Sequence, residues 1–355
     1  MPSGTKQGPR IAVGRLSQLF GLFFLVALGL GYPVLNRFDP RAAPGLSDVR
    51  AYAALVTGTA GPEVGHVRFR VLVPWVARPF YRVAQGRLGT WDPVMVGLLV
   101  ADALFVAGTA VLIVLLGGIL EHRLRVGPAV GLVGGLLYLV NFAVPNLRLV
   151  GMVDAGEGFF LLSLLWCLAE SKLWALPVIG VLGALAKESF VPFSVVMTAT
   201  WWLSTQGALG RDLPPGDAAR VRRRRIGSAA WILASWVLSG ATTIAVQSSV
   251  SGTFASLLDF GLQLRGDDEF LGHFVRSLRD RNLWYVFLWL LPTAIPNLMR
   301  LPREWLAPVG GACAMAFALD AYYGAPPGAV GRALFSVAGP VLCLSLALLL
   351  VRSPS

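Results

Sequence analysis

The sequence predicts an all-α protein, a polytopic transmembrane helical bundle of about ten spans. Of its 355 residues, 55% are hydrophobic and only 14% are charged, whereas about 25% of the residues in a soluble domain are charged. The charges divide the chain into apolar intervals, and the basic residues recur on alternate connections. These observations exclude a soluble globular protein. Ten spans of about 20 residues leave no room for a large soluble domain, so residues 1–355 are expected to form a single integral membrane domain.

The expected spans are intervals that carry few charges or none. They cover residues 16–35, 93–120, 126–147, 158–169, 173–186, 189–204, 228–250, 282–299, 305–319 and 333–351. The first interval is too long for a signal-peptide core and lacks a small-residue cleavage site after it, so we expect it to remain as a span. In the third interval, Gly127, Gly131 and Gly135 form a ladder of small residues that lets a neighbouring helix approach closely.

Basic residues predict the orientation, because short loops rich in Lys and Arg stay on the cytoplasmic side of a membrane. Their distribution over alternate connections places both termini in the cytoplasm. Residues 36–92 then form a long first outer loop that carries interfacial helices, residues 205–227 a basic cytoplasmic loop, and residues 251–281 a further outer loop. This topology also explains the net charge of +11, so the expected partners include membrane lipids and no nucleic acid.

Several common catalytic motifs are missing from the sequence. It contains no H-E-x-x-H, C-x-x-C, G-x-x-x-x-G-K-[ST] or G-x-S-x-G pattern. Its cysteines, Cys167, Cys313 and Cys343, lie in apolar stretches, where a free Cys behaves as a small hydrophobe. Zinc hydrolysis, ATP-driven transport and Ser-triad chemistry therefore have no local support.

The first outer loop is the part of the chain richest in candidate functional groups. Asp48 and Tyr52 are four residues apart, so a carboxylate and a phenol share one helix face. The following segment, residues 66–82, interleaves arginines with aromatic residues. This pattern is typical of an amphipathic interfacial helix with its cations on lipid headgroups. Alternatively, some of these arginines, Arg68 and Arg70 among them, hold a phosphate through bidentate hydrogen bonds.

Asp154 and Glu157 open the short fourth span. Charged groups at membrane depth are costly, and they normally face the interior of a bundle or a wet cavity. With a spacing of three, these two share a helix face, as paired carboxylates for acid–base chemistry or metal binding do. The same spacing fits a capping box, with Asp154 as the N-cap residue. For Glu157 we favour the capping interpretation.

Lys187 and Glu188 follow a long uncharged interval, 173–186. Adjacent residues project about 100° apart on a helix, so these two side chains need not bind each other. Lys187 either meets a lipid or ligand phosphate or extends to the membrane boundary by snorkelling. Arg332, an isolated cation just before the last span, is a second candidate for phosphate binding, with interfacial anchoring as the alternative.

The order of these features resembles the GT-C superfamily of integral membrane glycosyltransferases, particularly its bacterial members. The matching motifs are Asp48-x-x-x-Tyr52, Arg70-Val-Leu-Val-Pro74, Val153-Asp154, Ala186-Lys187-Glu188 and Gly331-Arg332. As a layout, they extend over most of the chain. The resemblance implies a multi-pass plasma-membrane enzyme that transfers a hexosyl or pentosyl group. The donor would be a polyprenyl phosphate or diphosphate sugar, and transfer would take place at the outer face.

The resemblance also implies roles for individual residues. In that superfamily an acidic residue of the first outer loop activates the acceptor, which makes Asp48 the expected general base and Asp39 its reserve. The expected substrate-binding residues are Tyr52, His66, Arg68, Arg70, Asp154, Lys187, Glu188 and Arg332. The arginines and the lysine of this set would neutralise charge on the leaving phosphate. Metal use varies within the superfamily, so a divalent metal cofactor stays open, and no residue is assigned as a metal ligand.

Two other interpretations stay open. A transporter or lipid-carrier flippase would use discontinuous helices around Asp154 and Lys187 as a site near the middle of the membrane, although no inverted repeat is visible. A membrane scaffold would use the same charges only to anchor helices. The enzyme hypothesis predicts that Asp48, Arg70, Lys187 and Arg332 line a common cavity open to the outer leaflet.

Overall fold

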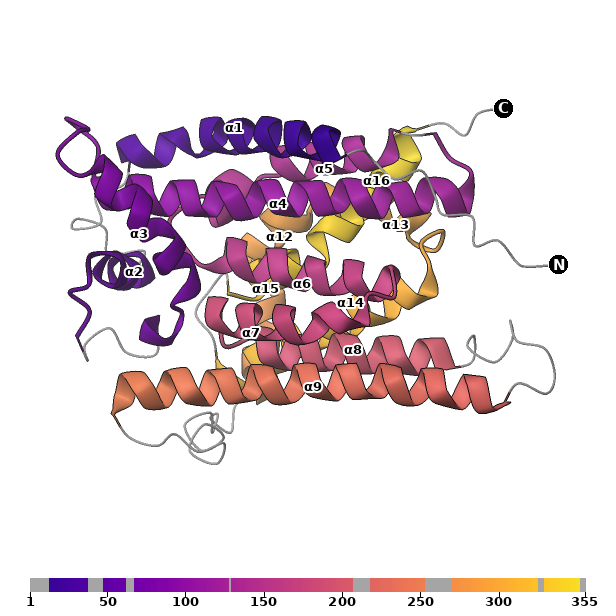
Figure 1. Ribbon diagram of the computed structural model, residues 1–355. Coiled ribbons are helices and arrows are strands. Elements are labelled where there is room, and N and C mark those ends of the chain that lie inside the picture. The colour runs from indigo at the N-terminus through magenta and orange to yellow at the C-terminus, as the bar shows by residue number, and fades with distance from the viewer. Residues whose placement is uncertain are drawn as a thin grey trace.

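The structure of the protein is a computed structural model that describes residues 13–37, 47–61, 67–127, 129–206, 218–252, 270–324 and 329–351. Within these ranges every regular element is a helix (Figure 1), which confirms the predicted all-α class. In chain order, the helices are α1 (Val13–Arg37), α2 (Ser47–Thr57), α3 (Leu72–Ala84), α4 (Pro93–Leu124), α5 (Val130–Val140), the π-helix η2 (Val144–Arg148), α6 (Asp154–Ala169), the 3₁₀-helix η3 (Leu173–Ala175), α7 (Leu176–Ala186), α8 (Phe190–Gln206), α9 (Ala218–Ser251), α11 (Phe270–Leu278), α12 (Arg281–Phe287), α13 (Leu290–Leu298), α14 (Arg303–Tyr323), α15 (Ala329–Val337) and α16 (Gly339–Leu350).

Several of these helices are suited to a membrane. Among the described residues, four helices are long and apolar enough to cross one, namely α1, α4, α9 from Ile226 onward, and α14. Helices α15 and α16 meet the same criterion as a pair, which is bent by 57° at the break between them. The chain therefore has the apolar helices of a membrane protein. The prediction of about ten spans is not confirmed, because the other expected spans fold into shorter helices.

Two of the predicted spans are interrupted where a proline begins a new helix. Proline has no N–H to donate, so it fits best in the first turn of a helix, where that N–H would have no partner within the helix. Pro145 lies in the first turn of η2, which follows α5 inside the expected third span. Pro340 lies in the first turn of α16, directly after the bend at Ala338 inside the expected last span.

The basic connection predicted over residues 205–227 is shorter than expected. Helix α8 extends to Gln206, and α9 begins at Ala218. The arginine cluster 220–225 therefore belongs to the first turns of α9 rather than to a loop. Further along α9, apolar side chains such as Trp231 and Val237 are exposed, as on a surface that contacts lipid.

Helix α4 runs along the bundle next to α1 (Figure 1) and packs against α1, α3, α5 and α6. The predicted glycine ladder lies at its contact with α5. A Cβ atom added to Gly131 would lie 2.6 Å from the carbonyl oxygen of Val114, and one added to Gly117 would lie 2.1 Å from the Cα of Gly131. The two helices thus approach to backbone distance, as the spacing of small residues predicts.

Helices α2 and α3 come from the connection between α1 and α4, and they lie together at the left end of the bundle in Figure 1. Helix α3 packs onto α4 and buries Val73 and Ala77. The first turn of α6 reaches the same place, because a Cβ on Gly156 would lie 2.8 Å from Val73 and 3.6 Å from Ala186 at the end of α7. This packing gathers the polar residues of four distant segments.

Candidate functional site

Arg70 joins the first connection to the break between α7 and α8. It lies just before α3 and is largely buried, with 9% of its surface exposed. Its Nε donates to both carboxylate oxygens of Glu188, at 3.0 and 2.9 Å, and its terminal Nη2 lies 2.5 Å from one of them. The other terminal nitrogen donates to the Tyr52 hydroxyl at 2.8 Å and lies 4.0 Å from the Asp48 carboxylate. One guanidinium therefore contacts three side chains from two different segments.

The predicted pairing of Asp48 with Tyr52 on one face of α2 has a clear structural counterpart, since both side chains approach the same arginine. Tyr52 is fully buried. Burial raises the pKa of the Tyr52 phenol above its ordinary value, and the nearby Arg70 opposes this effect without cancelling it. The phenol therefore stays protonated over the physiological pH range.

Lys187 is the centre of a second group of contacts. It ends α7 in an extended conformation, with φ −163° and ψ 138°, and its ammonium points to the first turn of α6. Its Nζ lies 2.7 Å from Asp154 Oδ1 and 3.0 Å from Glu157 Oε2. The second carboxylate oxygen of Glu157 accepts a hydrogen bond from the Ser189 hydroxyl. Two buried carboxylates and one lysine thus satisfy each other, as charges inside a protein must.

Arg332 completes this group from α15. Its terminal nitrogen lies 3.6 Å from the second oxygen of Asp154. The Asp154 carboxylate therefore lies between two cations, Lys187 and Arg332. At 3.6 Å the contact with Arg332 is an ion pair that is too long for a hydrogen bond.

We call the connected set of these side chains the ion network. Its members are Asp48, Tyr52, Arg70, Asp154, Glu157, Lys187, Glu188, Ser189 and Arg332. The two halves meet at the adjacent residues Lys187 and Glu188. The side chains of Asp48, Glu188 and Arg332 are 33%, 22% and 22% exposed, whereas that of Asp154 is 3% exposed. A ligand would meet these three partly exposed side chains first.

Most of the side chains expected to bind substrate belong to this network. Arg68 does not: its terminal nitrogen donates to Ser251 at the end of α9, at 3.2 Å, and its guanidinium lies over the Phe69 ring. Asp39 and His66 lie outside the described residues. The remaining expected residues from distant parts of the chain are in contact, and their role in binding stays a prediction.

The capping interpretation of Asp154 and Glu157 is wrong. The N-cap residue of α6 is Val153, and no side chain caps this helix end. Both carboxylates are instead directed at Lys187, because a buried ammonium on a neighbouring segment attracts them more strongly than the backbone N–H groups do. The Lys187 side chain is 15% exposed and pairs inside the bundle, so snorkelling does not describe it either.

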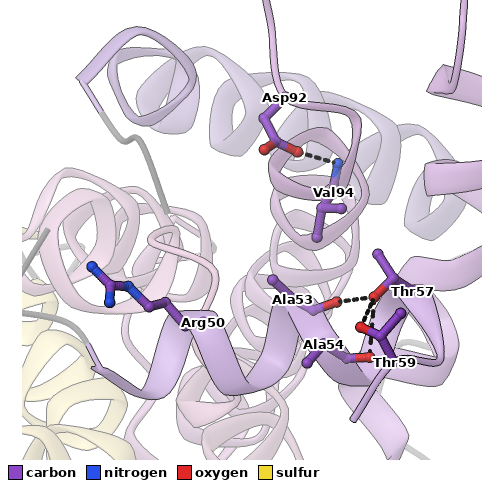
Figure 2. A pocket seen from close by; sticks show the side chains of 7 residues that line it. All are labelled: Arg50, Ala53, Ala54, Thr57, Thr59, Asp92 and Val94. Carbon is purple, nitrogen blue, oxygen red and sulfur yellow. Dashed lines mark hydrogen bonds between the residues drawn. The ribbon is translucent and has the colours of Figure 1, made fainter. Parts of the chain in front are cut away.

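The structure also contains an open pocket of about 410 Å³ beside α2. Figure 2 shows its lining, which consists of Arg50, Ala53, Ala54, Thr57 and Thr59 together with Asp92 and Val94 at the start of α4. The Asp92 carboxylate accepts a hydrogen bond from the N–H of Val94 at 2.8 Å and so caps α4. At 100° per residue, Arg50 and Thr57 lie on the face of α2 opposite to Asp48. The pocket is therefore separate from the ion network.

No group of three or more His, Cys, Asp or Glu residues within the described ranges is arranged to hold a metal ion. Asp154 and Glu157, the pair that the sequence offered for metal binding, are directed at Lys187. The groups available for chemistry are thus carboxylates, a phenol and cations. Such groups can accept a proton and stabilise a phosphate.

Sequence reasoning missed Arg148, which lies beside the network at the end of η2. It is 1% exposed, and its donors reach the carbonyl oxygens of Asp154 and Arg332 and the hydroxyl of Ser336 at 2.5, 2.8 and 2.7 Å. Its position directly after the expected third span gave it the pattern of a boundary cation. Only a three-dimensional arrangement reveals that it points inward.

Comparisons of the chain with protein-family models, with curated proteins and with solved structures find no match. The function of the protein is therefore inferred from the chemistry of the ion network itself.

Proposed function

We propose that this protein is a membrane glycosyltransferase of the GT-C type. It would transfer a sugar from a polyprenyl phosphate or diphosphate donor to an acceptor hydroxyl at the outer face of the membrane. The observation that carries the proposal is that one network contains both a partly exposed carboxylate, Asp48, and a partly exposed cation, Arg332. Transfer from a phosphate-linked donor requires a base for the acceptor and a cation for the leaving group.

Asp48 is the proposed general base. Its carboxylate is 33% exposed and lies 4.0 Å from Arg70, whose guanidinium is engaged with Glu188 and Tyr52. The acceptor hydroxyl would give its proton to Asp48 while its oxygen attacks the anomeric carbon. The bond from that carbon to the phosphate oxygen would break, and the phosphate would leave with the bonding electrons.

Arg332 is the proposed contact for the leaving phosphate. Its nearest described ionic partner is 3.6 Å away, so its N–H groups are available for hydrogen bonds to phosphate oxygens. Lys187 is engaged by two carboxylates. We therefore assign Lys187 and Arg70 to holding the carboxylates in place, and Arg332 to the donor.

The proposal includes the membrane topology. About ten spans with both termini in the cytoplasm of a bacterial plasma membrane would put α2 and α3 at the outer surface. Helix α3 supports this arrangement, because it packs on the bundle through Val73 and Ala77 while Trp75 and Val83 stay exposed. Exposed apolar side chains of this kind are what an interfacial helix places in the membrane boundary.

A transporter or lipid-carrier flippase is the alternative, and one observation favours it. Charged residues of the network lie at or near breaks between helices: Lys187 between α7 and α8, and Arg332 on α15 before the 57° bend. Discontinuous helices with charges at the break are typical of transporter sites.

The test uses the purified protein in liposomes with a panel of radiolabelled hexosyl and pentosyl polyprenyl phosphates and a membrane extract as the acceptor source. We expect covalent transfer of label by the natural protein and a loss of about 100-fold or more for Asp48→Asn, since a general base contributes 10²–10⁴-fold. Glu170→Gln is the matched control. The Glu170 carboxylate is 38% exposed, much like that of Asp48, but it lies at the C-terminal end of α6, whereas the network residues Asp154 and Glu157 lie in the first turn.

Full transfer by both Asp48→Asn and Asp39→Asn would contradict the assigned mechanism. Movement of labelled lipid across the bilayer, without any covalent product, would favour the carrier function instead.

A further inference from the structure

Arg148 links the backbones of two helices that hold network residues. Its three hydrogen bonds go to the carbonyl oxygen of Asp154 in α6 and to the carbonyl oxygen of Arg332 and the hydroxyl of Ser336 in α15. The guanidinium also lies 5.5 Å from the centre of the Phe335 ring. Its described hydrogen-bond acceptors are therefore neutral oxygens, although a buried cation is usually paired with a carboxylate.

The two carbonyl groups belong to the residues whose side chains form the ion pair at 3.6 Å. One guanidinium thus holds the main chains of both Asp154 and Arg332. A planar fork of N–H donors suits this arrangement, because it can reach several acceptors in fixed directions, whereas a lysine presents a single ammonium.

Helix α15 needs such a contact. It has nine residues and is separated from α16 by the 57° bend, so side-chain contacts rather than a continuous helix determine its position. The segment that carries Arg148 is held in place separately. Shortly after Arg148 in the chain, the N–H of Gly151 donates a hydrogen bond to the Asp102 carboxylate of α4 at 3.0 Å. Arg148 then connects a segment anchored on α4 to α15.

We infer that Arg148 is a positioning residue, which clamps α15 to the first turn of α6 and so sets the place of the Arg332 guanidinium beside Asp154. Its effect on catalysis rests on the proposed function, whereas the clamp itself does not. The structure provides a direct reporter for the clamp. A Cβ atom on Gly158 would lie 3.8 Å from the Cβ of Ser336, which is the mean Cβ separation of a disulfide, about 3.8 Å.

The test combines Gly158→Cys and Ser336→Cys with either the natural Arg148 or Arg148→Lys. Because Ser336→Cys removes one of the three acceptors of Arg148, the comparison tests the two carbonyl contacts, whose acceptors both double-cysteine backgrounds retain. The full-length protein in detergent is treated with a mild oxidant, and mass spectrometry of its peptides follows the cross-link between positions 158 and 336. Peptide mapping separates this product from disulfides of the natural cysteines. We expect the cross-link to form readily with Arg148 and to form much more slowly with Arg148→Lys, which keeps the charge but loses the fork. Equal rates in the two proteins would overturn the inference.

A second readout separates positioning from folding. Sugar transfer by Arg148→Lys should fall about 100-fold in kcat, the loss that a misplacement of about 1 Å can cause. Prolonged oxidation of the triple variant should restore transfer by replacing the clamp covalently, and reduction should abolish transfer again. If the cross-link forms without any recovery, Arg148 does not act through the position of α15. Absence of transfer by the natural protein, with an Arg148-dependent cross-link, would refute the proposed function and leave the clamp supported.

Discussion

The ion network and the polar cluster between α11 and α14 are both buried, and they differ in reach and charge. The cluster consists of His273, Ser277 and Asp320, each 7–8% exposed. The Ser277 hydroxyl donates to the Asp320 carboxylate, and the imidazole of His273 lies 3.2 Å from the carbonyl oxygen of Ala321. These contacts link two neighbouring helices, whereas the network links α2, the start of α3, α6, the break after α7, and α15.

This difference separates a structural cluster from a candidate site. A hydroxyl that bonds a carboxylate satisfies both groups and needs no ligand. The network has charges of both signs, and it includes an acid and a cation that are partly exposed. Polar groups are buried in both regions. The partial exposure of Asp48, Glu188 and Arg332, together with the reach of the network across the fold, therefore marks the network as the candidate site.

The variant with the largest expected effect, Lys187→Met, tests whether the network also stabilises the fold. Lys187→Met leaves Asp154 and Glu157 buried without their shared cation, and the loss of one partner of a buried ion pair costs about 3–5 kcal/mol. The free energy of unfolding in detergent, followed by circular dichroism against denaturant, measures this loss. Lys172→Met is the matched control, because that ammonium is 42% exposed and 3.9 Å from Glu170, and its effect should stay below about 1 kcal/mol.

A triple variant gives an internal check on the cause. Lys187→Met combined with Asp154→Asn and Glu157→Gln removes the unpaired charges, and it should regain much of the lost stability. A triple variant as unstable as Lys187→Met alone would mean that packing of the lysine chain, and not its charge, is responsible.

A smaller effect is expected from the α11–α14 cluster. Ser277→Ala leaves the Asp320 carboxylate without this donor, and an unsatisfied buried group costs about 1–3 kcal/mol. Because the cluster does not contact the network, transfer of labelled sugar should be unchanged once the protein is folded. The same denaturant titration and the transfer assay check both statements, and loss of transfer in a fully folded Ser277→Ala protein would place the cluster within the site.

The sequence predicted the helical class and the glycine contact well, because both follow from local composition. The helix-type pattern and the spacing of Gly131 and Gly135 are independent of how the chain folds back on itself. The pairing of Asp48 with Tyr52 was also accessible, since a spacing of four determines a common helix face.

The partners of the charged residues could not be predicted in the same way. The spacing of Asp154 and Glu157 also fitted a capping box, the interpretation that the sequence favoured for Glu157. The correct interpretation depended on Lys187, which lies 33 and 30 residues away in the chain. Arg148 is a stronger case. Its acceptors in α15 lie 184 and 188 residues away. Both are neutral oxygens, a backbone carbonyl and a hydroxyl, so no charge pattern in the sequence marks the contact. Such contacts follow from tertiary packing and not from sequence periodicity.

The smallest expected change in stability belongs to Arg332→Gln, and it gives the sharpest contrast within the network. The ion pair at 3.6 Å is loose and the side chain is 22% exposed, so its loss should alter the free energy of unfolding by less than about 1 kcal/mol. The carbonyl that binds Arg148 is retained, and the clamp should therefore persist. If Arg332 binds the leaving phosphate, kcat for sugar transfer should nevertheless fall about 100-fold or more, as it does when one preorganised donor is removed from a charge-stabilising site. An Arg332→Gln protein that is unstable but fully active would show instead that Arg332, like Lys187, stabilises the fold. Transfer is expected to fall without a matching loss of stability only if this cation faces a ligand.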